Sequence, residues 1–176
     1  MITVCTATIA GREEMLAQCV ESVKQQTLQV TDHLILLDTE RKGGAWTKQQ
    51  LLEQVKTEWC ILLDDDDLID PDYCKRLTDE AGDADVVYGW CRSDIGFDNY
   101  NAHFSDSRLA IGESVVPHCA MFKTEAARAV GGVPQIEGYD LAMWRKMLAN
   151  GSKFKSVPET LWTYRLSREW WHESRP

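Results

Sequence analysis

Residues 61–72 read ILLDDDDLIDPD, in which four consecutive aspartates, Asp64–Asp67, stand directly behind an apolar run. The run Trp59–Leu63 has the length and composition of a strand that is buried on both faces. Adjacent carboxylates repel one another and raise one another's pKa values. Four of them at the end of a buried strand would therefore be costly if they were left unpaired.

Upstream of this stretch, apolar strands alternate with helical patterns. Strands are expected at 2–8, 33–37 and 59–63, and helices are expected from Gly11 onward and over 47–56. Strands that are apolar throughout and alternate with helices are typical of a parallel sheet covered by helices on both faces. The first 63 residues therefore predict a β-α-β-α-β unit of an α/β fold, with right-handed crossovers.

The second half of the chain is less regular. Strands are expected at 85–91, 115–122, 153–157 and 160–164, and helices at 71–81, 124–130 and 140–149. Residues 92–114 are polar and lack periodicity, which predicts a variable loop or hairpin. No repeat or linker divides the chain, so one domain is expected over 1–176, with a tail at 166–176.

The composition narrows the class of protein. The chain has 176 residues, and 44% of them are hydrophobic, which is enough for a core and argues against disorder. The formal charge of −9 argues against broad adhesion to nucleic acid or anionic lipid. The six cysteines show no CxxC or metal-ligand spacing, and Cys5, Cys19, Cys60 and Cys91 are expected in the core. Without a signal peptide or an apolar run long enough to span a membrane, the sequence predicts a soluble, cytoplasmic protein.

Asp38 follows the second expected strand as Asp64–Asp67 follow the third. Ligands of an open parallel sheet bind beyond the carboxyl ends of its strands, so these carboxylates are expected at one edge. A divalent cation would remove their repulsion, and hard oxygen ligands suit Mg²⁺ or Mn²⁺, which keep positions open for phosphate oxygens. The turn is therefore a candidate platform for a metal and a diphosphate.

Three structures other than a metal and diphosphate site are known for acidic turns of this kind. A solvated turn in which Asp66 or Asp67 caps the next helix remains open. An EF-hand is excluded, because position six counted from Asp64 is not glycine and position twelve is Lys75 rather than Glu. A phosphatase of the DxDxT type is a near miss, since Leu68 stands in place of the Thr.

Five segments occur in an order that is informative as a set: TVCTATIAGREEMLAQCVESVKQQT, LILLDTERKGGAWTKQQLLEQ, TEWCILLDDDDLIDPDYC, VVPHCAMFKTEAARAVGGV and IEGYDLAMWRKMLANGSKFKSVPETLWTYR. In this order the chain resembles a short, single-domain form of the inverting GT-A glycosyltransferases of family 2. Residues 92–114 are the main part outside the resemblance. It implies a GT-A fold and transfer of a hexose-like sugar from a nucleotide-diphosphate sugar, with UDP as the default, and with inversion at the anomeric carbon.

The resemblance also implies roles for individual residues. The residues expected to bind the donor are Thr8, Arg12, Asp38, Gly43, Gly44, Lys48, Asp64, Asp65, His118 and Arg165. Among these, Asp38 would contact the base or ribose, while a structural role for His118 and a surface ion pair for Arg165 remain open. The divalent metal, Mn²⁺ or Mg²⁺, would be held by Asp64 and Asp66 as the DxD pair, by Asp67, and by the late His172.

The reaction needs a base as well as a metal. The metal would stabilise charge on the departing diphosphate as a Lewis acid, and the acceptor hydroxyl needs a carboxylate on the opposite face. The family usually has a Glu-Asp pair here, but Gly138 occupies the position of the second acid. The base is then Glu137 or Asp140, with a narrow preference for Glu137, while Asp140 as a helix cap remains open.

Two other functions remain open. A nucleotidyltransferase has a related sheet, but TATIAGREE matches its Gly-rich basic loop poorly. A nucleotide-sugar-binding module with weakened or no catalysis is motivated by Gly138. The acceptor is open between a small molecule, a glycan, a lipid and a modified nucleobase in DNA, and Trp170 and Trp171 are candidates for acceptor or oligomer contacts. Residues 1–91 are expected to bind donor and metal, and 92–165 the acceptor and base.

Overall fold

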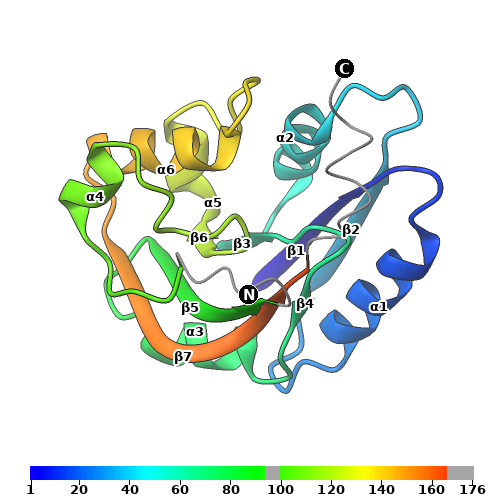
Figure 1. Ribbon diagram of the computed structural model, residues 1–176, viewed down its shortest axis with the longest axis horizontal. Coiled ribbons are helices and arrows are strands. Elements are labelled where there is room, and N and C mark those ends of the chain that lie inside the picture. Colours follow the sequence, from blue (N-terminus) through cyan, green and yellow to red (C-terminus); the bar gives the residue numbers. More distant parts are fainter. Residues whose placement is uncertain (94–99, 166–176) are drawn as a thin grey trace.

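The computed structural model describes residues 1–93 and 100–165. Its centre is a seven-stranded sheet in the order β2-β1-β3-β6-β5-β7-β4 (Figure 1). The strands are β1 (Ile2–Thr8), β2 (Asp32–Leu37), β3 (Trp59–Leu62), β4 (Leu68–Ile69), β5 (Val86–Ser93), β6 (Met121–Lys123) and β7 (Phe154–Tyr164). The helices are α1 (Glu13–Lys24), α2 (Gly44–Gln54), α3 (Tyr73–Glu80), α4 (Asp106–Ala110), α5 (Thr124–Ala129) and α6 (Tyr139–Ala149).

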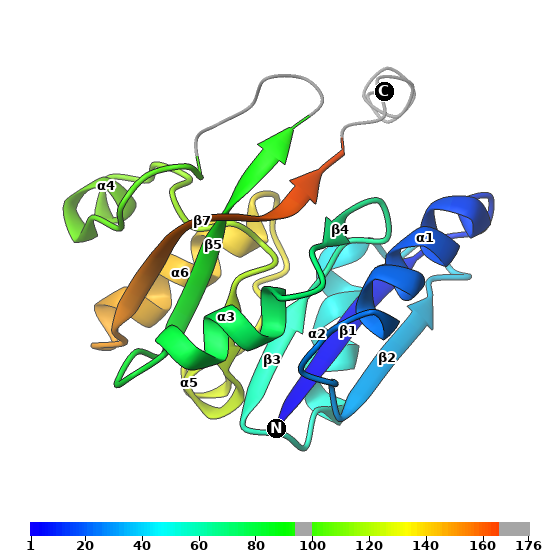
Figure 2. The same ribbon diagram turned by 90° about the horizontal axis from the view of Figure 1, so that it is seen from below.

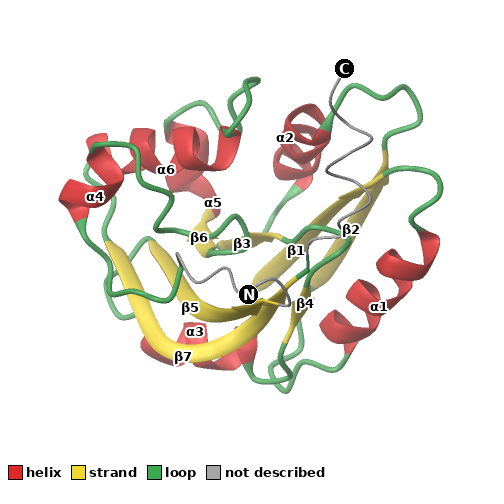
Figure 3. Ribbon diagram, viewed as in Figure 1, coloured by secondary structure: helices red, strands yellow, loops and turns green. Residues whose placement is uncertain are grey.

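The sheet is mostly parallel in strand direction, as predicted. β1, β2 and β3 run the same way, and so do β5 and β7, whereas β6 and β4 run the opposite way. Helices α1 and α3 lie on one face, and α2, α4, α5 and α6 lie on the other (Figure 3). Figure 2 shows α1 and α3 lying across the strands of their face. The predicted α/β class with helices on both faces is therefore confirmed.

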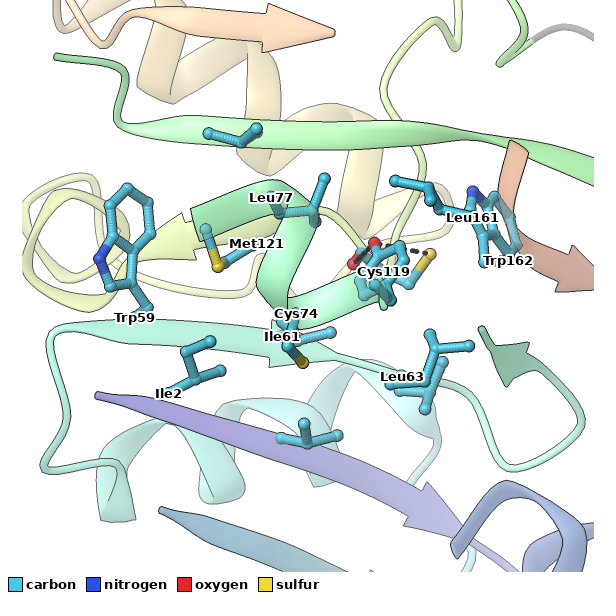
Figure 4. Packing of buried hydrophobic residues seen from close by; sticks show 14 of the residues in the cluster. Ile2, Trp59, Ile61, Leu63, Cys74, Leu77, Cys119, Met121, Leu161 and Trp162 are labelled. Carbon is cyan, nitrogen blue, oxygen red and sulfur yellow. Dashed lines mark hydrogen bonds between the residues drawn. The ribbon is translucent and has the colours of Figure 1, made fainter. Parts of the chain in front are cut away.

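Alternation along β3 explains how one strand serves two cores. Trp59, Ile61 and Leu63 point to the α1–α3 side, where they pack with residues such as Leu77 (Figure 4). Cys60 and Leu62 point to the side covered by α2, α5 and α6. Because side chains alternate across a strand, a continuous apolar run is needed when both faces are covered. The apolar run ahead of the acidic turn is therefore fixed by burial on both sides.

Several expected boundaries were wrong. The strand expected at 115–122 is reduced to β6, because Pro117 opens a turn in which Ala120 N–H bonds its carbonyl. The two strands expected on either side of Pro158 are one strand, β7, which passes Pro158 at a register irregularity against β5. Proline lacks a backbone donor and is tolerated at such bulges. The short strand β4 and the helix α4 were not expected, and α2 begins at Gly44 rather than at 47.

All six cysteines are buried, so the expectation that Cys5, Cys19, Cys60 and Cys91 lie in the core is confirmed. Burial is the main cause that raises the pKa of the Cys19 thiol to about 12. These thiols therefore serve as small apolar groups of the core. Within the described ranges, the helices are all too short or too polar to cross a membrane.

His33 on β2 predicts a pH dependence of stability. Its Nε2 lies 3.0 Å from Thr6 Oγ1, and burial, aided by Lys24, lowers its pKa to about 4. The unfolded chain, with a histidine pKa of about 6.5, binds more protons between these values. Stability is therefore full above about pH 6.5 and falls by roughly 2–3 kcal/mol towards pH 4. Urea unfolding of the wild type and of His33→Gln from pH 7 to 4.5 measures it; equal slopes for both proteins contradict the prediction.

Candidate functional site

The carboxyl ends of β1, β2 and β3 meet at one edge of the sheet. Asp38 N–H donates to Thr8 O at 2.8 Å, and Leu63 N–H donates to Cys5 O at 3.0 Å, so the three strand ends are locked together. The segments that follow these strands carry Arg12, Asp38 and the acidic turn Asp64–Asp67. The clustering that the sequence predicts from strand direction is thus present.

Asp38 shapes the loop that leads into α2. Its carboxylate accepts hydrogen bonds from the backbone N–H of Lys42 at 3.0 Å and of Gly43 at 2.7 Å. Gly43 has φ of +98°, a conformation that side chains disfavour, and α2 starts at the next residue, Gly44. Asp38 therefore fixes the approach to the N-terminus of α2, in addition to any contact it makes with a ligand.

Asp65 joins the acidic turn to the loop after β1. Its Oδ2 accepts from Thr8 Oγ1 at 2.6 Å and from Arg12 Nε at 3.0 Å, and its Oδ1 lies 2.7 Å from Arg12 Nη2. The same guanidinium reaches Asp66 Oδ2 at 2.6 Å. Arg12 therefore pairs with two carboxylates of the turn at once, through a forked geometry that suits arginine.

This fork predicts a stability difference. Arg12→Lys keeps the charge but loses the forked bond to buried Asp65, and the free energy of unfolding should fall by about 1–2 kcal/mol. The matched control is Arg92→Lys, since Arg92 makes a similar fork to Asp70 at 2.6 and 2.7 Å on a more exposed surface, where pairs contribute little. Urea denaturation of both variants measures the difference; an equal loss contradicts it.

Asp64, Asp67 and His118 form the second half of the site. His118 Nε2 lies 2.7 Å from Asp67 Oδ2 and 3.4 Å from Asp64 Oδ2. The other oxygen of Asp67 accepts the backbone N–H of Arg165 at 2.9 Å, and the other oxygen of Asp64 pairs with the ammonium of Lys48. One atom from each of the three residues lies within 4.8 Å of the others.

This donor set fits a divalent cation. Two carboxylates and an imidazole are ligands that Mn²⁺ accepts, and the Asp64 side chain is 36% exposed, which leaves one side open to further ligands. Burial lowers the pKa of His118, but the charges of Asp64 and Asp67 outweigh it and raise the pKa. An ion would therefore have to displace a proton from the imidazole. Asp66 lies outside this trio and is paired with Arg12.

The question raised by four adjacent aspartates has an electrostatic answer. Burial raises the pKa of Asp64, but Lys48 and His118 outweigh it and lower the pKa to about 2. Burial, with the charge of Asp64, raises the pKa of Asp66, and burial also raises the pKa of Asp67. Arg12, Lys48 and His118 thus pair with the four carboxylates of the turn. The alternative in which Asp66 or Asp67 caps the next helix is wrong, because α3 begins at Tyr73 and has no side-chain cap.

Arg165 is held against the acidic turn. Besides its backbone bond to Asp67, its guanidinium donates to the carbonyl of Asp66 and to Gln18 on α1. Around His118 lie the rings of Trp162 and Tyr164, at centroid distances of 5.6 and 6.2 Å. These aromatic neighbours were not predicted from the sequence, although Trp162 and Tyr164 stand just before Arg165 in LWTYR, and that proximity to an expected site residue indicates a place near the site.

Glu137 and Asp140 differ in their surroundings. Asp140 belongs to the first turn of α6, whose cap position is Gly138, so Asp140 is not the helix cap. After burial, the negative charge of Asp140 helps to raise the pKa of Tyr139, Tyr100 and Tyr164, and the acidic turn also acts on Tyr164. Glu137 is exposed, whereas Asp140 is half-buried. Asp140 therefore faces the same group of tyrosines as the acidic turn.

Some expected site residues lie outside the described ranges. His172 falls there, as do Trp170 and Trp171. Tyr139 is the main site residue that sequence analysis missed. Its hydroxyl accepts a hydrogen bond from Lys48 Nζ at 2.8 Å, across 91 positions of sequence.

A sequence profile described as "Glycosyl transferase family 2" matches residues 31–150, more than half of the chain. S. aureus TarS 1–349 in complex with UDP has a TM-score of 0.77 and 13% identity, over 98% of this chain and 63% of that chain. The mannosyltransferase PcManGT from Pyrobaculum calidifontis, in complex with GDP-Man and Mn²⁺, has a TM-score of 0.74 and 16% identity, over 97% of this chain and 58% of that chain.

A second TarS 1–349 structure, in complex with UDP-GlcNAc, has a TM-score of 0.74 and 12% identity, over 96% of this chain and 59% of that chain. The chain thus spans less than two thirds of the length of these solved structures. No curated protein sequence matches the chain.

Proposed function

Since the chain belongs to glycosyl transferase family 2, we propose that it transfers a sugar from a nucleotide-diphosphate sugar to an acceptor hydroxyl. The family match and the structural likenesses confirm the expected GT-A fold. One observation carries the proposal: the strand ends that bear Thr8, Asp38 and Asp64–Asp67 meet beside a trio suited to a divalent ion. Solved structures of similar fold contain UDP, UDP-GlcNAc or GDP-Man, which supports a UDP or GDP sugar as donor.

The donor side of the site would lie mainly within residues 1–91, with His118 and Arg165 added from the second half of the chain. Asp38 holds the loop before α2, and the amides of Gly44 and its neighbours at the start of that helix suit an anionic group. Arg12, Lys48 and Arg165 provide positive charge around the turn. Lys48 acts from inside, because its side chain is only 1% exposed and its ammonium is engaged by Asp64 and Tyr139.

We propose that Asp64, Asp67 and His118 hold a divalent metal, Mn²⁺ or Mg²⁺. A bound ion would supply Lewis-acid stabilisation of the negative charge that develops on the departing diphosphate. The contribution of the chain itself is to gather the ligands and to balance their charge. Lys48 pairs with Asp64, and Arg12 pairs with Asp65 and Asp66, so part of the repulsion within the turn is offset and the turn keeps its shape.

The acceptor side would lie within residues 92–165. We assign the general base to Asp140 rather than to Glu137, because Asp140 is half-buried in the first turn of α6 and its charge acts on tyrosines beside the acidic turn, whereas Glu137 is exposed. A carboxylate on the face opposite the leaving group removes the proton of the acceptor hydroxyl as it attacks, which inverts the anomeric carbon. The acceptor class is one that offers such a hydroxyl: a small molecule, a glycan, a lipid or a modified base.

A binding module without turnover is the second candidate, and Gly138 favours it. A Cβ added at Gly138 meets no atom within 4 Å, but its φ of +67° is a left-handed conformation that side chains disfavour, so the backbone here favours glycine over the acid that the family usually carries. Turnover separates the two candidates. An enzyme releases nucleoside diphosphate as sugar is transferred, whereas a module binds the nucleotide sugar and leaves it intact.

The test is a panel of UDP-GlcNAc, UDP-glucose, UDP-galactose and GDP-mannose, each with Mn²⁺, with Mg²⁺ and with EDTA. We expect one donor to raise the melting temperature in the presence of the metal, because a ligand at 100 times its Kd stabilises the folded state by about 2.7 kcal/mol. The same donor should release its nucleoside diphosphate over time. Absence of binding by every donor contradicts the proposal, and binding without release supports the module.

A further inference from the structure

Lys48 is a buried cation with two defined partners. Its side chain is 1% exposed, and its Nζ contacts Asp64 Oδ1 and donates to Tyr139 Oη at 2.8 Å. It also lies 5.0 Å from the centroid of the Tyr139 ring. Burying an ammonium is costly unless its partners are well placed, so this geometry is held by both contacts. Lys48 thereby connects α2, the acidic turn and the start of α6.

The segment before α6 is attached to α2 at further points. Val133 N–H donates to Gln49 Oε1 at 2.8 Å, and Gln135 Nε2 donates to Ala45 O at 3.3 Å. Gly132, with φ of +69°, lets Gln49 approach closely, since an added Cβ would lie 2.4 Å from its Oε1. Residues 132–139 therefore rest on one side of α2, and the contact nearest Asp140 is the one between Lys48 and Tyr139.

Tyr139 lies at the centre of this arrangement. It is the first residue of α6 and directly precedes Asp140. Its hydroxyl also lies beside the N-terminus of α2, at 3.6 Å from the place of a Cβ on Gly44. The phenol keeps its proton, because burial outweighs the opposing charge of Lys48 and raises its pKa. Tyr139 is therefore suited to holding its neighbours in place and not to removing a proton.

We propose that Tyr139 is a positioning residue: through Lys48, its hydroxyl sets the first turn of α6, and with it Asp140, against Asp64 of the acidic turn. This inference rests on the glycosyl transfer proposed above. The base and the ligands of the donor come from segments far apart in sequence, and no described hydrogen bond or ion pair ties the Asp140 side chain directly to the turn. Since a misplacement of about 1 Å can cost about a hundredfold in rate, a fixed spacing between these groups matters for the transfer step.

The first experiment removes only the hydroxyl. Tyr139→Phe keeps the ring over Lys48 but leaves the buried ammonium with one partner fewer, so we expect a modest fall in the melting temperature. The KM of the donor should stay within about twofold, and kcat per folded molecule should fall about tenfold, as for loss of a hydrogen bond to a charged group. The control is Tyr88→Phe, a tyrosine of β5 whose pKa is raised mainly by burial, with no contribution from the acidic turn; it should leave kcat unchanged. A purely structural role would lower the melting temperature in the same way but leave kcat per folded molecule intact, so kcat per folded molecule decides between the two roles.

The second experiment tests whether the effect passes through Lys48. Kinetics of Lys48→Met, Tyr139→Phe and the double variant form a cycle, and we expect the double variant to be no slower than Lys48→Met alone. Lys48→Arg, which keeps the charge but moves the donor, replaces Lys48→Met in the cycle should that variant not fold. Full kcat in Tyr139→Phe, or multiplicative losses in the double variant, overturns the inference while leaving transfer itself established. Absence of transfer by the wild type removes the proposed function and this inference together.

Discussion

Asp140→Asn is expected to lower kcat by about a hundredfold to ten-thousandfold while leaving the affinity for the nucleotide sugar unchanged. The reason is that asparagine has nearly the shape of aspartate but cannot accept the proton of the acceptor hydroxyl. Asp140 sits in the first turn of α6, where the variant should not disturb the fold. Initial rates of nucleoside diphosphate release with acceptor present, together with calorimetric titration of the donor, measure the two quantities separately.

Glu137→Gln is the matched control for this experiment. Glu137 lies three positions earlier in the chain and is exposed, whereas Asp140 is half-buried. The variant should therefore keep kcat within about threefold of the wild type, in line with the small effects of exposed substitutions. A large loss in Glu137→Gln and none in Asp140→Asn would move the base to Glu137. Full activity in both variants would exclude a carboxylate base from this segment.

Asp67→Asn is expected to abolish the part of donor binding and transfer that depends on Mn²⁺, with a loss of about a hundredfold or more in metal affinity. Asp67 is buried between His118 and the backbone of Arg165, and asparagine can still accept one of these hydrogen bonds. The fold should therefore persist while one anionic ligand is lost. Thermal shifts of both proteins in a Mn²⁺ titration, with and without donor, measure the change.

Asp66→Asn is the control that tests whether the metal ligands are the trio and not the whole acidic turn. Asp66 pairs with Arg12 and lies outside the group formed by Asp64, Asp67 and His118. Its substitution should leave the Mn²⁺-dependent stabilisation close to that of the wild type. Retained metal dependence in Asp67→Asn, or its loss only in Asp66→Asn, would show that the ligand set is wrong.

The sequence predicted the parts of the fold that depend on local pattern. Apolar runs and helical spacing identify β1, β2 and β3 and the helices between them. Only β3 is apolar and buried throughout, as burial on both faces requires, whereas β1 includes buried threonines and β2 is a partly exposed edge strand. Strand direction then brings Asp38 and Asp64–Asp67 to one edge. The antiparallel insertion of β6 and the continuity of β7 past Pro158 were not predictable in this way, because they depend on which strands become neighbours in space.

The partners of the charged site residues were the least predictable part. Asp65 and Arg12, Asp67 and Arg165, and Lys48 and Tyr139 lie 53, 98 and 91 positions apart, so no local pattern links them. The sequence showed which residues are charged and where strands end, but not how the charges are shared. For the same reason Lys48 was expected to reach towards a nucleotide, whereas its ammonium is turned inward to Asp64.

The contact between Arg165 and Asp67 has a consequence for biosynthesis. The acidic turn is translated about one third of the way along the chain, but one oxygen of Asp67 gains its backbone donor only from the last residue of the described structure. A nascent polypeptide still held in the ribosomal tunnel can form β1 to β3 and yet leave this carboxylate without its donor. The sheet edge can therefore be built early in synthesis, whereas its final electrostatic balance must wait until the C-terminal strand emerges.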